Sequence, residues 1–272
     1  MAGRRPPALV HMKRRHWIEI SDRAWCPQAI KNAVTDYCRF VLAVSKCYHA
    51  IAPVLAGALQ QTGTRRVLDL CSGAAGPWTG LQPLLRDIGV EVVVCLTDKY
   101  PNIEAFERAG RMTQQAITYH SEPVDATQVP GNLHGFRTIF TAFHHFRPDQ
   151  ARAVVADAVA KGEGIGVFEC AQRRPLMLLL VLVTPLRVLL ATPFIRPFRW
   201  SRLLWTYLVP VVPLVLLFDS VVSCLRMYCV QELRDMTVGL DRYRWDIGVV
   251  RAKIVPVPVT YLIGVPIENP AC

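Results

Sequence analysis

Short apolar runs alternate with helical patterns through the middle of the chain. Unbroken apolar runs are typical of strands covered on both faces, whereas apolar residues spaced three and four apart indicate helices. Alternation of the two predicts right-handed βαβ units around a parallel sheet. The predicted strands are residues 66–71, 90–96, 116–120, 136–142 and 164–170, with helices at 102–112 and 148–161.

The two ends of the chain add further elements. Residues 17–60 are predicted to be helical, because apolar side chains recur at three- and four-residue spacing from Ile30 to Leu59. Near the C-terminus, a short helix is followed by two β-rich runs that predict an antiparallel hairpin at the sheet edge. These elements are residues 231–240 for the helix and 243–253 and 257–265 for the runs.

Residues 175–218 are much more apolar than the rest of the chain. The stretch 175–195 contains one charge, Arg187, and 203–218 contains none. A spanning helix needs about 20 apolar residues, but prolines interrupt both stretches, and spanning would place three arginines outside, against the positive-inside rule. We therefore expect a shallow hairpin in the headgroup region of a membrane. The alternative is a helical cap that packs on the domain and touches no lipid.

Composition and charge narrow the class of protein. The 272 residues are 52% hydrophobic and 19% charged, which excludes a disordered chain, a coiled coil and a collagen-like fibre. Eleven basic residues and no acids lie in 1–16 and 173–202, so the remainder of this +10 chain is net −1. The second cluster favours anionic headgroups over nucleic acid, because no nucleic-acid motif accompanies it. The eleven are Arg4, Arg5, Lys13, Arg14, Arg15, Arg173, Arg174, Arg187, Arg196, Arg199 and Arg202.

The cysteines and the N-terminus bear on the compartment. The nine cysteines include no CxxC pair, and several lie in apolar runs, which indicates buried free thiols rather than disulfides. The basic N-terminus lacks the apolar segment of a signal peptide. We therefore expect a reducing, cytoplasmic setting, with the protein associated with a membrane.

A loop of small residues and an acid follow the first two predicted strands. The loop after Asp69, Cys71-Ser72-Gly73-Ala74-Ala75-Gly76, leads into a helix that starts near Pro77. Small residues there let the backbone approach a ligand at the carboxyl edge of the sheet. Asp98 ends the second strand, 29 residues after Asp69. A carboxylate there can accept two hydrogen bonds from a ribose diol.

Together these features resemble the class I S-adenosylmethionine-dependent methyltransferases, over roughly residues 64–172. The resemblance implies a Rossmann-like seven-stranded sheet, S-adenosyl-L-methionine as cofactor, and a substrate lid at the place of the apolar insert. Ala74 and Ala75 stand where glycine is common in that family. A nicotinamide-dinucleotide enzyme is the rival, but the full GxGxxG pattern is absent. By this resemblance the cofactor is bound by Asp69, Cys71, Ser72, Gly73, Gly76, Asp98, Lys99, Asp125, Ala126 and Thr141.

His144 and His145 are the candidate catalytic residues, as in quinone and other small-molecule methyltransferases that carry a histidine pair after the fourth strand. Methyl transfer is an in-line displacement, so a base helps only a hydroxyl acceptor of high pKa. The alternative is that one histidine is structural and the other lines the adenosine pocket. Adjacent residues at a strand end point in opposite directions, so at most one should face the acceptor. No metal is expected, because spacing supplies no third ligand.

Three other side chains are secondary candidates, each with ordinary packing as the alternative. Trp25 could close over the cofactor, although a core tryptophan is the simpler expectation. Tyr48 and His49 lie on a predicted helix that could face the same cavity. Two ion pairs are also predicted, namely Glu169 with Arg173 and Asp219 with Arg226.

The sequence thus divides into four parts: a basic tail and helical cap (1–63), a cofactor-binding core (64–172), an apolar insert (173–218) and the end of the core (219–272). We predict a methyltransferase that acts at a membrane surface on a lipophilic small molecule, such as a quinone, prenyl, fatty-acyl or polyketide-like acceptor. Nucleic acid is not expected as a partner, and the oligomeric state is left open. The alternative is a non-catalytic Rossmann-like module that the insert anchors to a membrane or a partner.

Overall fold

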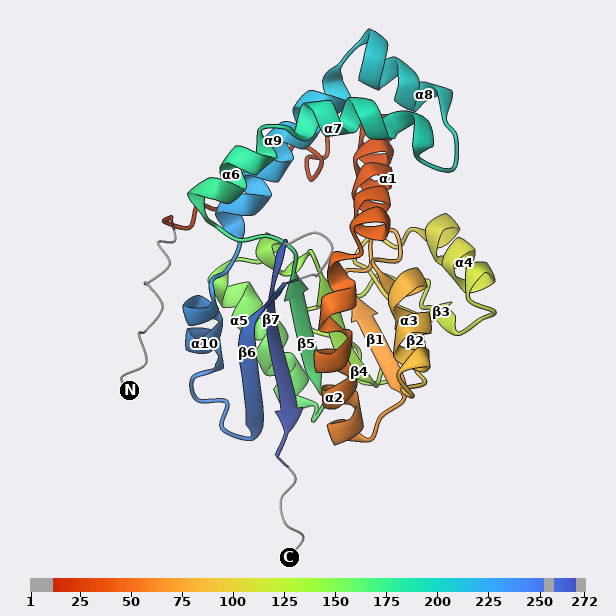
Figure 1. Cartoon of the computed structure of the whole chain (residues 1–272). Helices are drawn as coiled ribbons and strands as arrows, with labels where there is room; N and C mark the ends of the chain where they lie inside the picture. The colour runs from red at the N-terminus through yellow and green to blue at the C-terminus, as the bar shows by residue number, and fades with distance from the viewer. Residues whose placement is uncertain (1–11, 252–256, 268–272) are drawn as a thin grey trace, which may run out of the picture.

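The computed structural model describes residues 12–251 and 257–267 (Figure 1). Seven strands form one sheet in the order β3-β2-β1-β4-β5-β7-β6, with β1 to β5 parallel and β7 antiparallel to both of its neighbours. This is the predicted Rossmann-like sheet, with the predicted hairpin at its edge. The strands are β1 (Arg66–Leu70), β2 (Val93–Leu96), β3 (Ile117–Tyr119), β4 (Phe136–Phe140), β5 (Ile165–Glu169), β6 (Tyr243–Arg251) and β7 (Pro258–Pro266).

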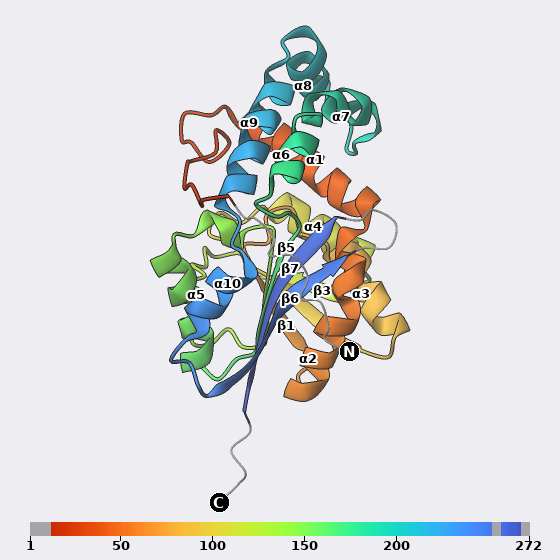
Figure 2. The ribbon, with the colours of Figure 1, turned by 60° about the vertical axis from the view of Figure 1, so that its left-hand side comes forward.

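Helices cover both faces of the sheet and form a further layer above it (Figures 1 and 2). The α-helices are α1 (Gln28–Ser45), α2 (Ala52–Thr62), α3 (Trp78–Asp87), α4 (Ile103–Met112), α5 (Pro148–Ala160), α6 (Pro175–Val181), α7 (Thr184–Ala191), α8 (Trp200–Leu203), α9 (Val211–Arg226) and α10 (Val230–Thr237). Short 3₁₀ or π turns are η1 (Cys47–Ile51), η2 (Phe143–His145), η3 (Thr192–Phe194) and η4 (Leu204–Leu208).

The N-terminal region differs from the prediction of continuous helix. Residues 12–27 form extended chain and turns, and α1 begins only at Gln28. Pro27 has extended geometry and disfavours a helical conformation in the residue before it. The helix α1 therefore cannot continue toward the N-terminus beyond Pro27. Arg4 and Arg5, in the basic tail, and Cys272 lie outside the described residues.

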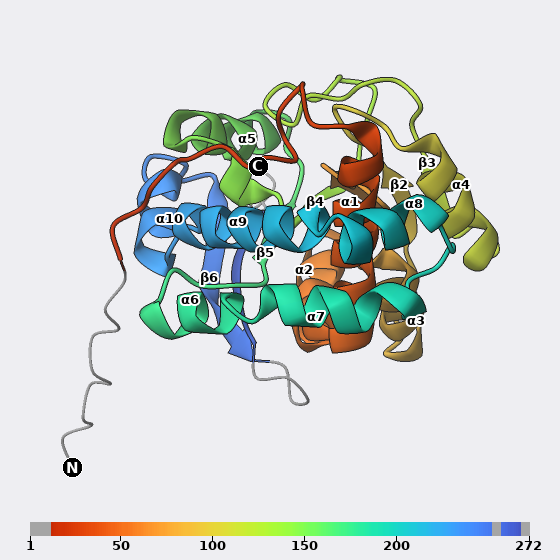
Figure 3. The ribbon, with the colours of Figure 1, turned by 90° about the horizontal axis from the view of Figure 1, so that it is seen from above.

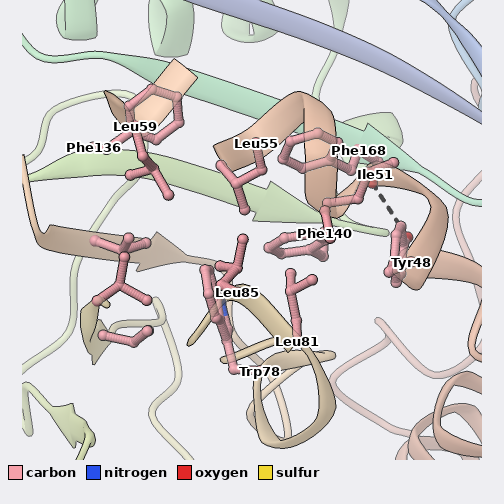
Figure 4. Close-up of a cluster of buried hydrophobic side chains, with 14 of the residues drawn as sticks. Tyr48, Ile51, Leu55, Leu59, Trp78, Leu81, Leu85, Phe136, Phe140 and Phe168 are labelled. Carbon is pink, nitrogen blue, oxygen red and sulfur yellow. Dashed lines mark hydrogen bonds between the residues drawn. The ribbon is translucent and has the colours of Figure 1, made fainter. Parts of the chain in front are cut away.

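One face of the sheet packs against α2 and α3 (Figure 4). Aromatic rings dominate this cluster: Trp78 meets the edge of Phe140 at 5.6 Å between centroids, and Phe140 stacks on Phe168 at 5.0 Å. Each large side chain contributes roughly 1.5–3 kcal/mol when fully buried. The opposite face packs against α5 and α10. The two clusters fix the carboxyl ends of β1 and β4 at one edge of the sheet.

The apolar insert forms the layer above that edge (Figure 2). Helices α7 and α9 lie side by side (Figure 3). Their buried residues Val188, Val212 and Val215 pack with Ile30 and Val34 of α1. α1 therefore connects the insert to the core, and α9 continues to Arg226, where it returns to the core.

The outer surface of the insert is exposed and apolar. Segment Pro175–Phe194 has a mean hydropathy of 2.1 and is long enough to cross a membrane. Only 17% of its most apolar stretch is buried in the structure. Two bent helix pairs, 28–62 and 200–226, are also long and apolar enough to cross a membrane if each pair is counted as one span. Trp200, expected at a lipid interface, is 78% exposed.

The arginines of the insert are placed differently from the prediction. Arg202 is 3% exposed, and its guanidinium lies 2.5 Å from a carboxylate oxygen of Asp36 on α1. Arg199 lies 3.6 Å from Asp36 and 3.6 Å from Glu104. Of the three arginines expected in the headgroup region, only Arg196 is exposed. The others fix the insert to α1 and α4, because Asp36 and Glu104 offer carboxylates directly beneath them.

Candidate active site

The loop after β1 has the backbone geometry of a ligand-binding turn. Gly73 and Gly76 take positive φ angles of 53° and 49°, and so do two residues that are not glycine, Cys71 at 56° and Ala75 at 76°. The left-handed region costs about 1–2 kcal/mol for a residue with a side chain. Such strain persists only where surrounding contacts impose it, and it is common at binding sites.

Asp69 and Ser72 impose this geometry from below. Asp69 is buried and accepts hydrogen bonds of 2.6 Å from the hydroxyls of Ser72 and Thr138. Burial raises the pKa of Asp69 to about 6, against the opposing effect of those hydrogen bonds. The Ser72 hydroxyl also accepts from the backbone N–H of Thr97. The side chains of Asp69 and Ser72, both predicted to bind the cofactor, therefore hold the loop in place from within the fold.

Asp98 lies directly against this loop. Its Oδ2 accepts from the Gly73 N–H at 2.8 Å, and its Oδ1 accepts from the Tyr100 N–H at 2.8 Å. Each carboxylate oxygen has a second lone pair, which leaves the group able to accept from a diol. A Cβ built on Gly73 would meet nothing within 4 Å, so the space beside it is open to a ligand. The loop and the acid thus lie at the same edge of the sheet, as the sequence predicts.

Lys99 separates two cavities. Its ammonium lies 2.9 Å from Asp125, and this hydrogen bond, with those from Thr127, lowers the pKa of Asp125 to about 2. Asp125 and Ala126 line the smaller cavity, of about 250 Å³, together with Cys71. Asp125 and Ala126, two of the predicted cofactor residues, therefore line one pocket that also contacts Lys99, the neighbour of Asp98.

The larger cleft, of about 1240 Å³, lies on the other side of Lys99. It extends from Gly73 and the start of α4 to the N-terminal half of α1, and Arg199 lies at its insert side. Its lining is strongly charged. The cationic members are Lys31, Arg39, Lys99, Arg108, Arg199 and Arg226, and the acidic members are Asp22, Asp36 and Glu104.

Thr141 and the secondary candidates lie outside this cleft. The Thr141 hydroxyl contacts the hydroxyl of buried Tyr48, which also donates to the Phe168 carbonyl at 3.2 Å. His49 faces Gly80 of α3. Trp25 is 71% exposed, so the expectation of a core tryptophan is wrong.

The two histidines do not sit on a strand end. β4 ends at Phe140, and His144 and His145 belong to the 3₁₀ turn η2. Successive residues in such a turn are about 120° apart rather than on opposite faces. The two rings consequently lie beside each other, with centroids 4.4 Å apart, and the predicted opposite orientation is wrong.

His144 lies between two carboxylates and is buried. Its Nδ1 is 3.0 Å from Glu169, which also accepts from the His144 backbone N–H at 3.0 Å. On the other side, His144 Nε2 lies 3.6 Å from Glu19. Burial alone would lower the pKa of His144, but the carboxylates of Glu169 and Glu19 outweigh it and raise that pKa to about 9. The predicted Glu169–Arg173 pair is wrong, because Arg173 pairs with Glu232.

His145 is the member of the pair that lines the cleft. Its Nδ1 lies 3.1 Å from Asp22, and its Nε2 lies 3.9 Å from Glu19. Arg226 also pairs with Glu19, at 3.1 Å. Burial acts to raise the pKa of Glu19, but the two histidines and Ser223 hold it at about 2.

The N-terminal segment brings these acids to the histidines, and α9 holds it there. Asp219 accepts from the backbone N–H groups of Ile20 at 2.6 Å and Ser21 at 3.2 Å. The predicted Asp219–Arg226 pair is wrong, since each group instead binds the segment that carries Glu19. Sequence reasoning did not find Glu19 or Asp22 as site residues. The available signal was slight: they are the first two acids of the chain, after a basic stretch.

Comparison with known proteins adds likeness of fold. No family model matches the chain, and no curated protein matches it. A putative O-methyltransferase from Nostoc punctiforme matches with a TM-score of 0.49 and 11% identity, over 92% of this chain and 64% of that one. An O-methyltransferase family protein from Burkholderia thailandensis has a TM-score of 0.47 and 11% identity, over 85% and 58%. An O-methyltransferase from neocarzinostatin biosynthesis, in complex with S-adenosyl-L-homocysteine, matches with a TM-score of 0.48 and 12% identity, over 88% of this chain and 59% of that one. The chain spans about three-fifths of the length of these proteins.

Proposed function

We propose that the chain is an S-adenosyl-L-methionine-dependent methyltransferase whose acceptor is a lipophilic small molecule with a polar or anionic head, met at a membrane surface. The observation that carries this proposal is the hydrogen bond from the Gly73 N–H to Asp98. It joins a small-residue loop to a strand-end carboxylate at the edge where nucleosides bind in Rossmann-like sheets.

The residues present fit that cofactor. Asp98 has lone pairs free for a ribose diol, and the open space beside Gly73 lets the backbone approach a ligand. The pocket at Asp125 and Ala126 would take the adenine. Beyond Lys99, the larger cleft would take the amino-acid end and the acceptor. When bound, the cofactor supplies an electrophilic methyl group on a positively charged sulfur.

The chain's own contribution to such a reaction is to bind, align and exclude water. Of the two predicted catalytic histidines, only His145 lines the cleft. Its Nδ1 is fixed by Asp22, which leaves Nε2 to face Glu19 and the cleft side. His144 is enclosed by Glu169 and Glu19, so we assign it a positioning role rather than contact with the acceptor.

The acceptor class follows from two surfaces. Six basic and three acidic side chains line the cleft, which favours an anionic or strongly polar head over a neutral one. The insert beside it exposes leucine, phenylalanine and tryptophan side chains, including Leu179, Leu190 and Phe194. An exposed apolar surface of this kind is typical of contact with membranes or apolar partners.

Calorimetric titration of the purified chain with S-adenosyl-L-methionine tests the cofactor assignment. We expect binding by the wild type and at least 100-fold weaker binding by Asp98→Ala. Asp241→Ala, which removes an exposed acid after α10, is the matched control and should bind as the wild type does. Failure of the wild type to bind would remove the enzyme proposal.

Release of S-adenosylhomocysteine, measured with lipophilic carboxylic acids and phenols, tests the acceptor. We expect turnover that rises when anionic vesicles carry the acceptor. Cofactor binding without turnover on any acceptor would favour the alternative, a non-catalytic module anchored by its insert.

A further inference from the structure

We propose that Glu19, His144 and His145 form a binding site for a divalent transition-metal ion at the wall of the large cleft. One ligand atom from each residue lies within 4.8 Å of the other two. Two imidazoles and a carboxylate are a common ligand set for zinc and related ions. The sequence alone gave no third ligand, because Glu19 lies 125 positions before His144.

A buried nitrogen independently points to a missing ligand. His144 Nε2 is buried and has no hydrogen-bond partner among the described residues. The nearest carboxylate oxygen, on Glu19, is 3.6 Å away, beyond hydrogen-bond distance. A buried polar atom without a partner is costly, and such atoms call for an unseen water or ion. A cation bound next to Glu19 would give this nitrogen a partner.

The distances need little change to bind a metal. In a tetrahedral site with bonds of 2.0–2.1 Å, neighbouring ligand atoms are about 3.4 Å apart. Here His144 Nε2 lies 3.6 Å from Glu19 Oε1, and His145 Nε2 lies 3.9 Å from Glu19 Oε2. The carboxylate thus approaches both histidines at nearly the spacing that coordination requires.

A carboxylate also contacts the Nδ1 atom of each histidine. His144 Nδ1 lies 3.0 Å from Glu169, and His145 Nδ1 lies 3.1 Å from Asp22. Metal-binding histidines almost always donate their second ring N–H to such a group, because this fixes the tautomer and the ring orientation. With hydrogen on each Nδ1, loss of any proton from Nε2 leaves both Nε2 atoms able to bind an ion on the side of Glu19.

The local charge suits a divalent ion. Glu19, Asp22 and Glu169 carry three negative charges, and Arg226 carries one positive charge. Once both imidazoles are neutral, as metal binding requires, these groups sum to −2. Arg226 lies 3.1 Å from Glu19 Oε1 and competes for that oxygen, whereas Oε2 faces His145. A metal would therefore bind Oε2 of Glu19 first.

Because His145 lines the cleft, the fourth coordination position would open toward it. A water or a small oxygen ligand could occupy that position. Binding of the ion stands on its own, whether or not the chain transfers methyl groups. If it does, the ion would polarise an acceptor oxygen, and His145 would serve as ligand rather than as base.

Titration of the chelator-treated full chain with Co²⁺, followed by visible absorption, tests the site, with Zn²⁺ calorimetry alongside. We expect one ion per chain and a spectrum of nitrogen and oxygen ligands. His145→Ala should weaken binding at least 100-fold, and Glu169→Gln about 10-fold. His134→Ala, an exposed histidine paired with Glu163, should bind as the wild type does.

Cofactor affinity and thermal unfolding of each variant separate loss of the site from loss of the fold. Because Glu19→Gln also breaks the Arg226 pair, His145→Ala is the decisive variant. Absence of one-to-one binding, a thiolate charge-transfer band, or unchanged affinity in folded His145→Ala would each overturn the site. Metal binding without cofactor binding would uphold it while removing the proposed methyltransferase.

Discussion

The sheet core and the apolar insert use similar side chains in opposite ways. Every residue of β4 and of β5 is buried, whereas α6, which contains only apolar residues, buries none. In the core, the apolar side chains pack against one another and are buried within the chain. In the insert, most of the large apolar side chains are exposed. Apolar side chains therefore build the folding core in one region and form an exposed surface in the other.

Ion pairs do not divide the two regions in this way. The core exposes the pair Lys99–Asp125 but buries Arg137 against Asp157, and the insert buries Arg202 against Asp36. A buried pair is costly to break because the remaining charge is left without compensation, while an exposed pair contributes little. The buried pair of Arg202 and Asp36 thus holds the insert on α1, whereas Arg187 and Arg196 stay exposed.

The largest effect should come from breaking that buried pair. In Arg202→Met, Asp36 would keep only longer contacts with Arg199 and Arg39, at 3.6 and 3.7 Å. We expect the free energy of unfolding in urea to fall by about 3 kcal/mol. Arg196→Met, at an exposed position, should change it by less than about 0.5 kcal/mol. Equal losses in the two variants would show that the pair does not anchor the insert.

A second test concerns a charge buried in the core. Because the pKa of Asp69 is raised from 3.8 to about 6, the folded chain binds more protons than the unfolded chain in that window. Stability therefore falls as pH rises through it. Asp69→Asn keeps a neutral side chain, so it should gain about 2 kcal/mol relative to wild type between pH 4 and pH 7. Urea unfolding at both pH values measures this, and a constant difference would contradict it.

The exposed surface of the insert gives the third test. Replacing Leu179, Leu186 and Leu190 with glutamine removes apolar area that the fold does not bury. We expect flotation with anionic vesicles to weaken at least tenfold, a loss of about 1.4 kcal/mol. The free energy of unfolding should stay within about 0.5 kcal/mol of wild type. Unchanged flotation, or a clear loss of stability, would show that this face meets protein instead.

The smallest effect belongs to the exposed core pair. Lys99→Met should change the free energy of unfolding by less than about 0.5 kcal/mol, because solvent screens the pair. The pKa of Asp125, held at about 2 by Lys99 and Thr127, should rise toward its ordinary range in an NMR titration. If Lys99→Met lowered the free energy of unfolding as much as Arg202→Met does, the exposed and the buried pair would contribute equally to stability, contrary to this prediction.

The sequence predicted the sheet well because its signals are local. Strand-length apolar runs were found at all seven positions, with end points shifted by a few residues. The Gly73–Asp98 contact was also predictable, because the ends of adjacent parallel strands meet at one edge.

The histidine cluster could not be predicted in the same way. Its members come from positions 19, 22, 144, 145, 169 and 226, and no periodicity links them. The 3₁₀ turn at His144 gave no hydrophobic pattern to distinguish it from a strand end. Likewise, the burial of Arg202 could not be predicted, because Asp36, which binds it, lies far away in the sequence on α1.

Helix α9 has one further consequence, since it belongs to both regions. Near its middle it exposes Leu214 and Phe218, and at its lower end Asp219 and Arg226 hold the segment that carries Glu19. If the exposed face of the insert meets a bilayer, as proposed above, a shift of this 16-residue helix would also move the segment that carries Glu19 and so change the surroundings of the two histidines.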